Sequence, residues 1–384
     1  MKLILNTERV IGGIQKALSV IPTKTGAAFL RALWIKAEGD RVSFYSTDAS
    51  IEFMGTYPAE VIEEGIIGVQ AQIFYGLMST CRENVKLEHK EADGTVSIVH
   101  KNGRCKLPVM SSDWFQQLQS FPETDSIVWR GDFFKLIVDK ISYCIKESND
   151  ITAFYCIYFN KNSDNKIDIC SLNGHQFSML RFQHDDFFVK IPDKGILIQK
   201  NYLASIAKII GNEEININFS ENRLFVKNNF NEIISIPLSN FDFPNYSNFL
   251  GRLADESIST LKINRKDLLE ALNRISTINN DNTSCTDFFF SENNDYITCS
   301  GVADNYGEVS EKINIQYNGN IKKITFRTIE IINIIEHFDS EELILHLTSD
   351  EGPCSFEGKD DPFYVVVVMP IRTREVTYEE QEEY

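Results

Sequence analysis

The stretch SLNGHQF at residues 171–177 places a Gly-His pair inside an otherwise strand-like run. A histidine in such a place can be a general base, a metal ligand or part of a binding surface. For catalysis, His175 would need a nucleophile, an acid or a metal partner within reach. Its neighbours Asn173, Gln176 and Ser178 supply no convincing charge or ligand set. The local sequence therefore argues against a catalytic His175.

The rest of the chain carries no recognisable catalytic or metal motif. The six histidines show no His-x-x-x-His spacing, and the eight cysteines form no Cys-x-x-Cys pair, which excludes the usual zinc and dithiol sites. No Gly-rich loop ends in Gly-Lys-Ser/Thr, the pattern that cradles phosphates. We therefore expect a protein that is not an enzyme and that needs no cofactor or metal.

Composition indicates a globular protein of several domains. The chain has 384 residues, 43% of them hydrophobic, and a net charge of −17. That charge argues against simple adhesion to nucleic acid or to an anionic membrane. The longest apolar run, YVVVVM at 364–369, is far shorter than the roughly 20 residues of a membrane-spanning helix. The start MKLILNTERV lacks the apolar core of a signal peptide, so we expect a cytoplasmic protein.

Two kinds of strand-and-helix element recur along the chain. An apolar strand followed by an amphipathic helix occurs at 3–21, 127–145 and 261–278, about 125 residues apart. A second such element occurs at 68–81, 196–210 and 324–338. Between them lie alternating strand runs joined by turn signals such as Asp93-Gly94. The repetition predicts an α+β fold with domains at 1–123, 127–250 and 258–373 and an acidic tail at 374–384. Three unrelated α+β domains are the alternative.

Four separated motifs follow one another along the chain: STDASIEF (46–53), SLNGHQF (171–177), FDFPNY (241–246) and YVVVVMPIR (364–372). In sequence and in order they resemble motifs of the bacterial beta sliding clamp family, the processivity subunit of DNA polymerase III. The resemblance spans nearly the whole chain. It implies the DNA clamp fold, in which each domain packs two helices on antiparallel sheets. Two three-domain subunits then close head to tail into a six-domain ring around duplex DNA.

The resemblance also implies a peptide-binding pocket. In the family, short linear peptides of the replicative polymerase, the clamp loader and other clamp-binding repair proteins dock where these motifs converge. Such a pocket suits apolar anchors entering a preformed groove. The alternative is that Phe177, Val367 and Met369 are plain core residues. Carried over by position, the pocket comprises Thr152, Tyr155, Leu172, Gly174, His175, Gln176, Phe177, Pro244, Asn248, Phe249, Val367, Met369, Pro370 and Arg372.

A ring also accommodates the negative charge of the chain. The six helical segments carry about twelve basic and about eight acidic side chains, so they are slightly positive. Weak attraction of such a lining to phosphates would permit sliding. The alternative is an ordinary solvated helix face. The expected DNA contacts are Lys24 and Lys200, which the resemblance favours, and Lys140, Arg265 and Arg274.

Ring closure needs complementary edges on the first and third domains. The resemblance assigns the first edge to the segment GRCKLPV and the second to NYGEVSEKI. Opposite charges would fix the register, although exposed pairs contribute only about 0–1 kcal/mol each, so backbone pairing and apolar contacts must contribute more. The expected interface residues are Arg104, Cys105, Lys106, Leu107, Glu308 and Glu311.

Three functions are consistent with these features. The first is a non-enzymatic clamp that tethers a DNA polymerase. The second is a DNA-independent peptide-binding scaffold of the same fold, and the third is an enzyme whose site the motifs do not reveal. The glutamate-rich tail at 374–384 predicts a disordered end that aids solubility, shields the pocket or repels acidic peptides.

Overall fold

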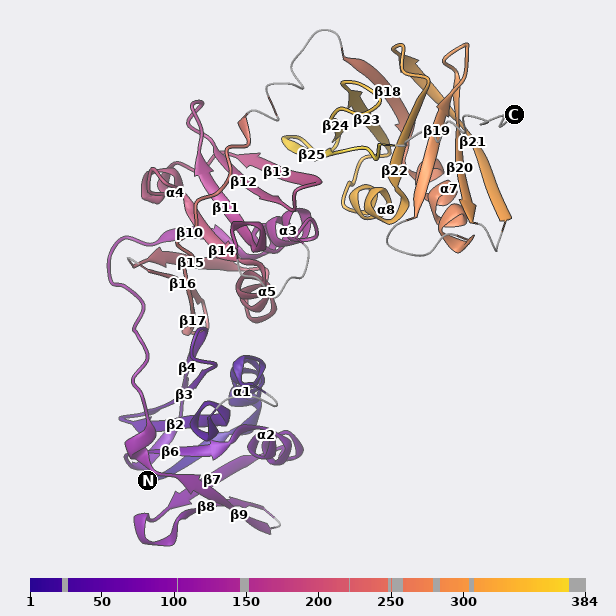
Figure 1. The fold of residues 1–384 in the computed structure, drawn as a ribbon. Helices are drawn as coiled ribbons and strands as arrows, with labels where there is room; N and C mark the ends of the chain where they lie inside the picture. Colours follow the sequence, from indigo (N-terminus) through magenta and orange to yellow (C-terminus); the bar gives the residue numbers. More distant parts are fainter. Residues whose placement is uncertain are drawn as a thin grey trace, which may run out of the picture. The chain divides into compact units, whose positions relative to one another are not determined.

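A computed structural model of the chain describes residues 1–22, 27–101, 103–145, 152–220, 222–247, 250, 258–278, 284–303 and 307–372. The chain divides into two compact units, and Figure 1 labels helices and strands of both. Unit 1 comprises Met1–Val138 and Ile198–Asn240, and unit 2 comprises Asp139–Leu197 and Phe241–Tyr384. The three domain boundaries expected from the sequence stay a prediction.

Unit 1 is built on an antiparallel sheet of thirteen strands. Their order is β10-β15-β16-β17-β4-β3-β2-β6-β9-β8-β7-β1-β5. The strands are β1 (Lys2–Asn6), β2 (Ala32–Glu38), β3 (Arg41–Thr47), β4 (Glu52–Pro58), β5 (Glu60–Glu63), β6 (Gly65–Gln70), β7 (Asn84–His89), β8 (Thr95–His100), β9 (Gly103–Met110), β10 (Ile127–Arg130), β15 (Glu214–Phe219), β16 (Arg223–Asn228) and β17 (Glu232–Pro237). The helices α1 (Thr7–Val20) and α2 (Ala71–Thr80) pack against each other, and α5 (Lys200–Ile209) packs on β17.

Unit 2 contains an antiparallel sheet of twelve strands in the order β14-β11-β12-β13-β25-β24-β23-β18-β21-β20-β19-β22. The strands are β11 (Cys156–Lys161), β12 (Ile167–Leu172), β13 (Gln176–Phe182), β14 (Ile196–Gln199), β18 (Ser259–Asn264), β19 (Cys285–Phe290), β20 (Tyr296–Ala303), β21 (Gly307–Asn318), β22 (Lys323–Arg327), β23 (Glu342–Leu347), β24 (Cys354–Gly358) and β25 (Tyr364–Val368). Its helices are α4 (Asp185–Lys190), α7 (Arg265–Ile278) and α8 (Thr328–Glu336). The helix α3 (Gly131–Ser142) begins in unit 1 and ends in unit 2.

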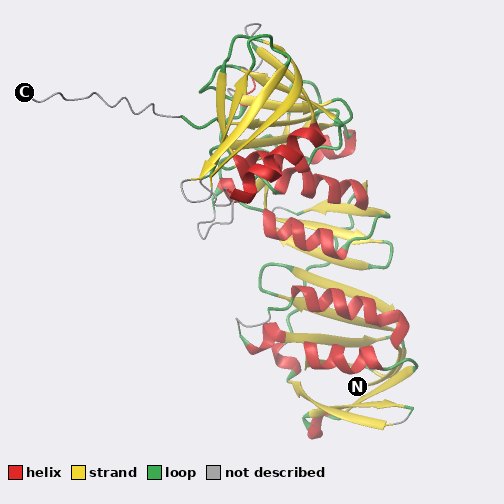
Figure 2. Ribbon diagram, turned by 90° about the vertical axis from the view of Figure 1, so that its right-hand side faces the viewer, coloured by secondary structure: helices red, strands yellow, loops and turns green. Residues whose placement is uncertain are grey.

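All six expected strand-and-helix elements are present. The first kind appears as β1–α1, β10–α3 and β18–α7, and the second as β6–α2, β14–α5 and β22–α8. In each element the helix begins at the residue after the strand ends. Within each unit, helices lie against strands of the sheet (Figure 2).

Helix α1 illustrates how the sequence specifies these elements. The side chain of Asn6 accepts a hydrogen bond from the backbone N–H of Arg9 and so caps the first turn. Val10, Ile14 and Ala17 then recur at helical spacing and are fully buried. Gly13 on the same face leaves room for the ring of Tyr57, because a Cβ atom there would overlap the Tyr57 hydroxyl.

No helix in the described part of the chain is long and apolar enough to span a membrane.

Candidate functional site

The SLNGHQF segment leads into β13, which pairs with β25 near the end of the chain. The pairing is antiparallel and runs from Gln176 opposite Val368 to Leu180 opposite Tyr364. Both strands are rich in β-branched or other apolar residues, which favours an extended, largely buried conformation. Two of the four separated motifs therefore meet as neighbouring strands.

An apolar cluster lies at this strand pair, and we call it the β13–β25 cluster. Its buried members are Cys170, Leu172, Phe177, Met179, Tyr246 and Val367, with Tyr158, Phe243, Leu250 and Val365 packed against it. The predicted pocket residues Leu172, Phe177 and Val367 are thus brought together. Phe177 and Val367 are each only 4% exposed, so they form a floor and not an open wall.

Sequence reasoning missed seven residues of this cluster: Tyr158, Cys170, Met179, Phe243, Tyr246, Leu250 and Val365. Cys170, Met179 and Val365 each lie two positions from a predicted pocket residue, and strand side chains two apart share one face of a sheet. That alternation was a usable signal. Tyr246 stacks on Phe177 with 5.4 Å between ring centroids, but no local pattern predicts that contact.

Tyr246 is held by a polar network beneath the cluster. Its hydroxyl donates to Asp168 at 3.0 Å and accepts from the side-chain amide of Asn160 at 3.1 Å. Asp168 also accepts a hydrogen bond from Arg181 Nε at 2.6 Å. Burial raises the pKa of Tyr246, so the phenol stays protonated and remains a donor. This network fixes the FDFPNY segment against β13.

The turn before β13 forms an exposed rim. Gly174 has a φ of 87°, a left-handed conformation that suits glycine. The side-chain oxygen of Asn173 accepts from the backbone N–H groups of His175 and Gln176 at 3.0 and 2.8 Å. The carbonyl oxygen of His175 accepts from the N–H of Met369 at 2.9 Å. His175 therefore joins the turn to the segment after β25, and its imidazole is exposed.

The other predicted pocket residues occupy varied positions. Gln176 and Pro370 are buried, Met369 and Pro244 are half-buried, and Thr152 is exposed. Tyr155 is half-buried at the end of a short turn, next to a second apolar cluster of Ala153, Cys156 and Leu197. Arg372 is exposed and pairs with Glu351 at 3.3 Å. Asn248 and Phe249 lie outside the described residues.

Unit 1 contains a strand pair of the same kind, but its chemistry is polar. There β17 pairs with β4, and Ser235 lies opposite Glu52. Ser235 Oγ donates to the Glu52 carboxylate at 2.9 Å, and Arg223 Nη2 lies 3.5 Å from the same carboxylate. These polar side chains occupy the place that Phe177 and Val367 take in unit 2.

Lys140 does not fit the predicted role of a phosphate contact, and that prediction is wrong for this structure. The residue is 6% exposed. Its ammonium donates to Asp361 at 2.6 Å and to Asp339 at 2.9 Å. A buried ammonium that is already paired with two carboxylates cannot contact a phosphate group of DNA.

The remaining predicted DNA contacts differ in accessibility. Arg265 is half-buried, and its Nε donates to the carbonyl oxygen of Ser340 at 3.0 Å. Arg274 is 52% exposed at the side chain, and its Nε donates to Glu311 at 2.8 Å. Lys200 is half-buried at the first position of α5. Lys24 lies outside the described residues.

The predicted interface strands each have an unpaired edge among the described residues. Between Gly103 and Leu107, β9 pairs with β8, and it meets β6 only through Val109 and Met110. Over residues 307–314, β21 pairs with β20, and it meets β18 only over residues 315–318. Arg104, Lys106 and Glu308 are exposed on these strands, whereas Cys105, Leu107 and Glu311 are half-buried.

No group of three or more His, Cys, Asp or Glu side chains that could hold a metal occurs in the described part of the chain. None of the cysteines at 81, 105, 144, 156, 170, 285, 299 and 354, all of which lie in the described part of the chain, forms a disulfide.

The chain matches two domains of one protein family. Residues 1–119 match the N-terminal domain of the DNA polymerase III beta subunit, and residues 253–372 match its C-terminal domain. Together these matches cover more than half of the chain.

Individual relatives match over nearly the full length. The chain is 20% identical to the beta sliding clamp of Buchnera aphidicola and 22% identical to that of Staphylococcus epidermidis. Each comparison covers 97% of this chain and all of the relative. In structure, the chain is similar to Caulobacter crescentus pol III beta, with a TM-score of 0.88 and 18% identity, covering 97% of this chain and all of that one. A putative DNA polymerase III beta subunit from Eubacterium rectale gives a TM-score of 0.87 and 19% identity at the same coverage. The α+β clamp fold is thereby confirmed, and the chain belongs to the DNA polymerase III beta subunit family, the bacterial beta sliding clamps.

Proposed function

We propose that this chain is a sliding clamp that encircles duplex DNA and tethers the replicative DNA polymerase, which makes synthesis processive. Family membership at both ends of the chain supports this function. The observation that carries it is the regular return of the six strand-and-helix elements, which supplies the repeated modules that a ring requires.

Ring closure would join two copies of the chain head to tail. Inside the chain, β4 pairs with β17 and β13 pairs with β25, both antiparallel. The open edges of β21 and β9 are the strands left for a third pairing of this kind, between copies. Arg104 and Lys106 would face Glu308 and Glu311 across it, with Cys105 and Leu107 as apolar contacts.

The β13–β25 cluster would be the floor of a site for short linear peptides of the polymerase, the clamp loader and other clamp-binding repair proteins. The exposed Gly174 and His175 would form its rim. Half-buried Met369 can adapt its shape to different apolar anchors. We assign the same site to the rest of the predicted pocket, including Asn248 and Phe249.

Contact with DNA would be weak and exchangeable. Arg274, Arg265, Lys200 and Lys24 remain the proposed contacts, and Lys140 is removed from that set. Because a closed ring retains DNA by topology, few phosphate contacts are needed and sliding is not impeded.

The protein would act without catalysis, metal or cofactor, and in the cytoplasm. A processivity subunit needs only binding surfaces, and the proposed surfaces are built from apolar floors, strand edges and basic side chains. Its chemistry would be that of its polymerase partner.

Retention on DNA tests the function. The protein is loaded by its cognate clamp loader onto nicked circular DNA, which is then linearised. A sliding clamp is retained on the circle and lost from the linear molecule. A DNA-independent peptide-binding scaffold is retained on neither, and that result would overturn the proposal. Light scattering gives the first check, because a persistent 44.0 kDa monomer forms no closed ring.

A further inference from the structure

The backbone carbonyl of Lys140 connects the two strands of the proposed peptide site. It accepts a hydrogen bond from Ser178 Oγ on β13 at 2.9 Å and another from the Tyr364 hydroxyl on β25 at 2.9 Å. Ser178 follows Phe177 directly, and Tyr364 is the first residue of the strand that carries Val367. One carbonyl at the end of α3 thus contacts both strands that form the floor of the cluster.

The ammonium of the same residue reaches the segment that leads into β25. Its Nζ donates to Asp361 Oδ1 at 2.6 Å, and the two side chains are 7% and 2% exposed. Asp361 also accepts from the backbone N–H and the hydroxyl of Ser340, at 2.9 and 2.7 Å. A buried cation with such a partner constrains position strongly, because separating the two would leave a charge without compensation.

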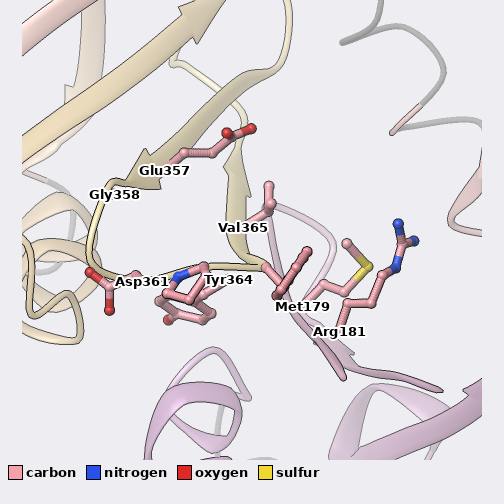
Figure 3. A pocket seen from close by; sticks show the side chains of 9 residues that line it. Met179, Arg181, Glu357, Gly358, Asp361, Tyr364 and Val365 are labelled. Atoms are coloured by element: carbon pink, nitrogen blue, oxygen red, sulfur yellow. The ribbon is translucent and has the colours of Figure 1, made fainter. Parts of the chain in front are cut away.

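The start of β25 lies between the protein core and an open cavity, and Tyr364 itself is only 2% exposed. This cavity of about 330 Å³ borders the strand, and its lining includes Met179, Arg181, Asp361, Phe363, Tyr364 and Val365 (Figure 3). Phe363 in this wall has a φ of 66° and is 60% exposed. On the side of this cavity β25 has fewer packing neighbours, so the hydrogen bonds of Asp361 and Tyr364 with Lys140 contribute to its position.

Unit 1 repeats this arrangement at the matching helix position. Lys16 is the tenth residue of α1, as Lys140 is the tenth of α3. Lys16 Nζ donates to Glu232 at 2.6 Å, and Glu232 is the first residue of β17. The neighbouring strand pair is the polar one, with Glu52 opposite Ser235. An apolar cluster therefore lies beside the strand pair near Lys140, whereas the strand pair near Lys16 carries polar side chains.

We propose that Lys140 is a positioning residue for peptide binding. It holds β25 beside β13 in the spacing that a bound peptide requires, without itself touching the peptide. This inference rests on the proposed peptide site. It predicts that affinity depends on a side chain that is not part of the site's surface.

The test compares Lys140→Met with Lys16→Met, which removes a half-buried ammonium from the matching helix position in unit 1. In each variant the carboxylate keeps other donors: Ser340 for Asp361, and Tyr57 and Asn228 for Glu232. Both variants are therefore expected to fold, which circular dichroism checks. The probe is the strongest binder among short fluorescent peptides that tile the cognate replicative polymerase, and fluorescence anisotropy measures its dissociation constant.

Lys140→Met should weaken peptide binding by about tenfold, mainly through faster dissociation, because residues in one hydrogen-bond network are energetically coupled. Lys16→Met should leave the dissociation constant unchanged, and Lys140→Arg should restore part of the affinity. Tyr364→Phe removes one contact with the carbonyl and keeps the ion pair, so it should weaken binding by a smaller factor.

The two possible failures are distinguishable. If the wild-type protein binds none of the tiled peptides, the proposed peptide site is wrong. If the wild type binds, but Lys140→Met and Tyr364→Phe bind as tightly as Lys16→Met, the peptide site stands and the positioning role of Lys140 is wrong.

Discussion

Phe177 and Val367 are direct cross-strand partners in unit 2, whereas Glu52 and Ser235 hold the corresponding places in unit 1. The correspondence is supported by the preceding turns. Three residues before Phe177, Gly174 has a φ of 87°, and three residues before Glu52, Ala49 has a φ of 79°. The same local backbone thus leads into an apolar pair in one unit and a hydrogen-bonded polar pair in the other.

This difference predicts one peptide site per chain. Val367→Ser removes apolar surface from the floor and buries a hydroxyl, so peptide affinity should fall by about tenfold or more. The control is Ile233→Ser. Ile233 is also buried, but it lies on β17, the strand that carries Ser235 of the polar pair in unit 1. Titration by calorimetry should give one peptide per wild-type chain. Two peptides per chain, or equal losses in both variants, would contradict the assignment.

Arg274 should contribute to DNA contact and little to stability. Its ion pair with Glu311 is half-exposed, and such pairs are worth about 0–1 kcal/mol, so Arg274→Ala should lower the free energy of unfolding by less than about 1 kcal/mol. Each lost phosphate contact should reduce the salt slope of DNA binding by about 0.9. Urea unfolding and binding titrations at several salt concentrations measure the two effects. Glu311→Gln leaves the guanidinium in place and serves as the control. An unchanged slope in Arg274→Ala would remove this residue from the proposed DNA contacts.

Cys105 offers a probe of the proposed contact between copies. Cys105 is half-buried on β9, and Cys81 and Cys285 are half-buried elsewhere in the chain. Cys299 differs from them, because burial raises the pKa of its thiol to about 12 and suppresses the thiolate. Iodoacetamide should therefore modify Cys105 and leave Cys299 unreacted in the folded protein. As protein concentration rises through dimerisation, Cys105 should react more slowly while Cys81 keeps its rate. Mass spectrometry of tryptic peptides follows both, and a Cys105 rate independent of concentration would contradict an interface at β9.

Much of the fold was predictable because its signals are local. Apolar residues at helical spacing predict the helix α1, and the same spacing predicts α3 and α7. The hairpin signal Asp93-Gly94 is also confirmed, because Gly94 has a φ of 57° at the turn before β8. Period and turn chemistry are properties of short segments, so one sequence reveals them.

The candidate site was predictable only in part, because its decisive contacts join distant residues. The motif resemblance predicts that Phe177 and Val367 lie in one pocket, whereas no local sequence pattern predicts the stacking of Tyr246 on Phe177. Lys140 was misassigned for the same reason. Its charge and helical position suit a solvated face, and only the tertiary structure supplies Asp361 as a buried partner 221 positions away.

Acid should weaken unit 2 through Asp361. Burial raises the pKa of this carboxyl, but hydrogen bonds from Lys140 and Ser340 lower it by more, so the pKa lies below its ordinary value of 3.8. A carboxyl whose pKa is lower in the folded state stabilises the protein above the unfolded-state pKa, and this contribution is lost as pH falls through the folded-state pKa. The loss should therefore occur below about pH 3.8. Urea unfolding at a series of pH values measures it.

Two variants make the origin of this pH dependence explicit. Lys140→Met removes a donor that lowers the pKa of Asp361, so the folded-state and unfolded-state pKa values should lie closer together, and the loss of stability on acidification should be smaller than in the wild type. Asp132→Asn is the control, because Asp132 pairs with Arg130 at the surface and its carboxylate is 43% exposed, where solvent screens the interaction. Its stability profile should follow that of the wild type. If Lys140→Met follows the wild-type profile as well, the ion pair with Asp361 does not set the acid limit, and another carboxylate must.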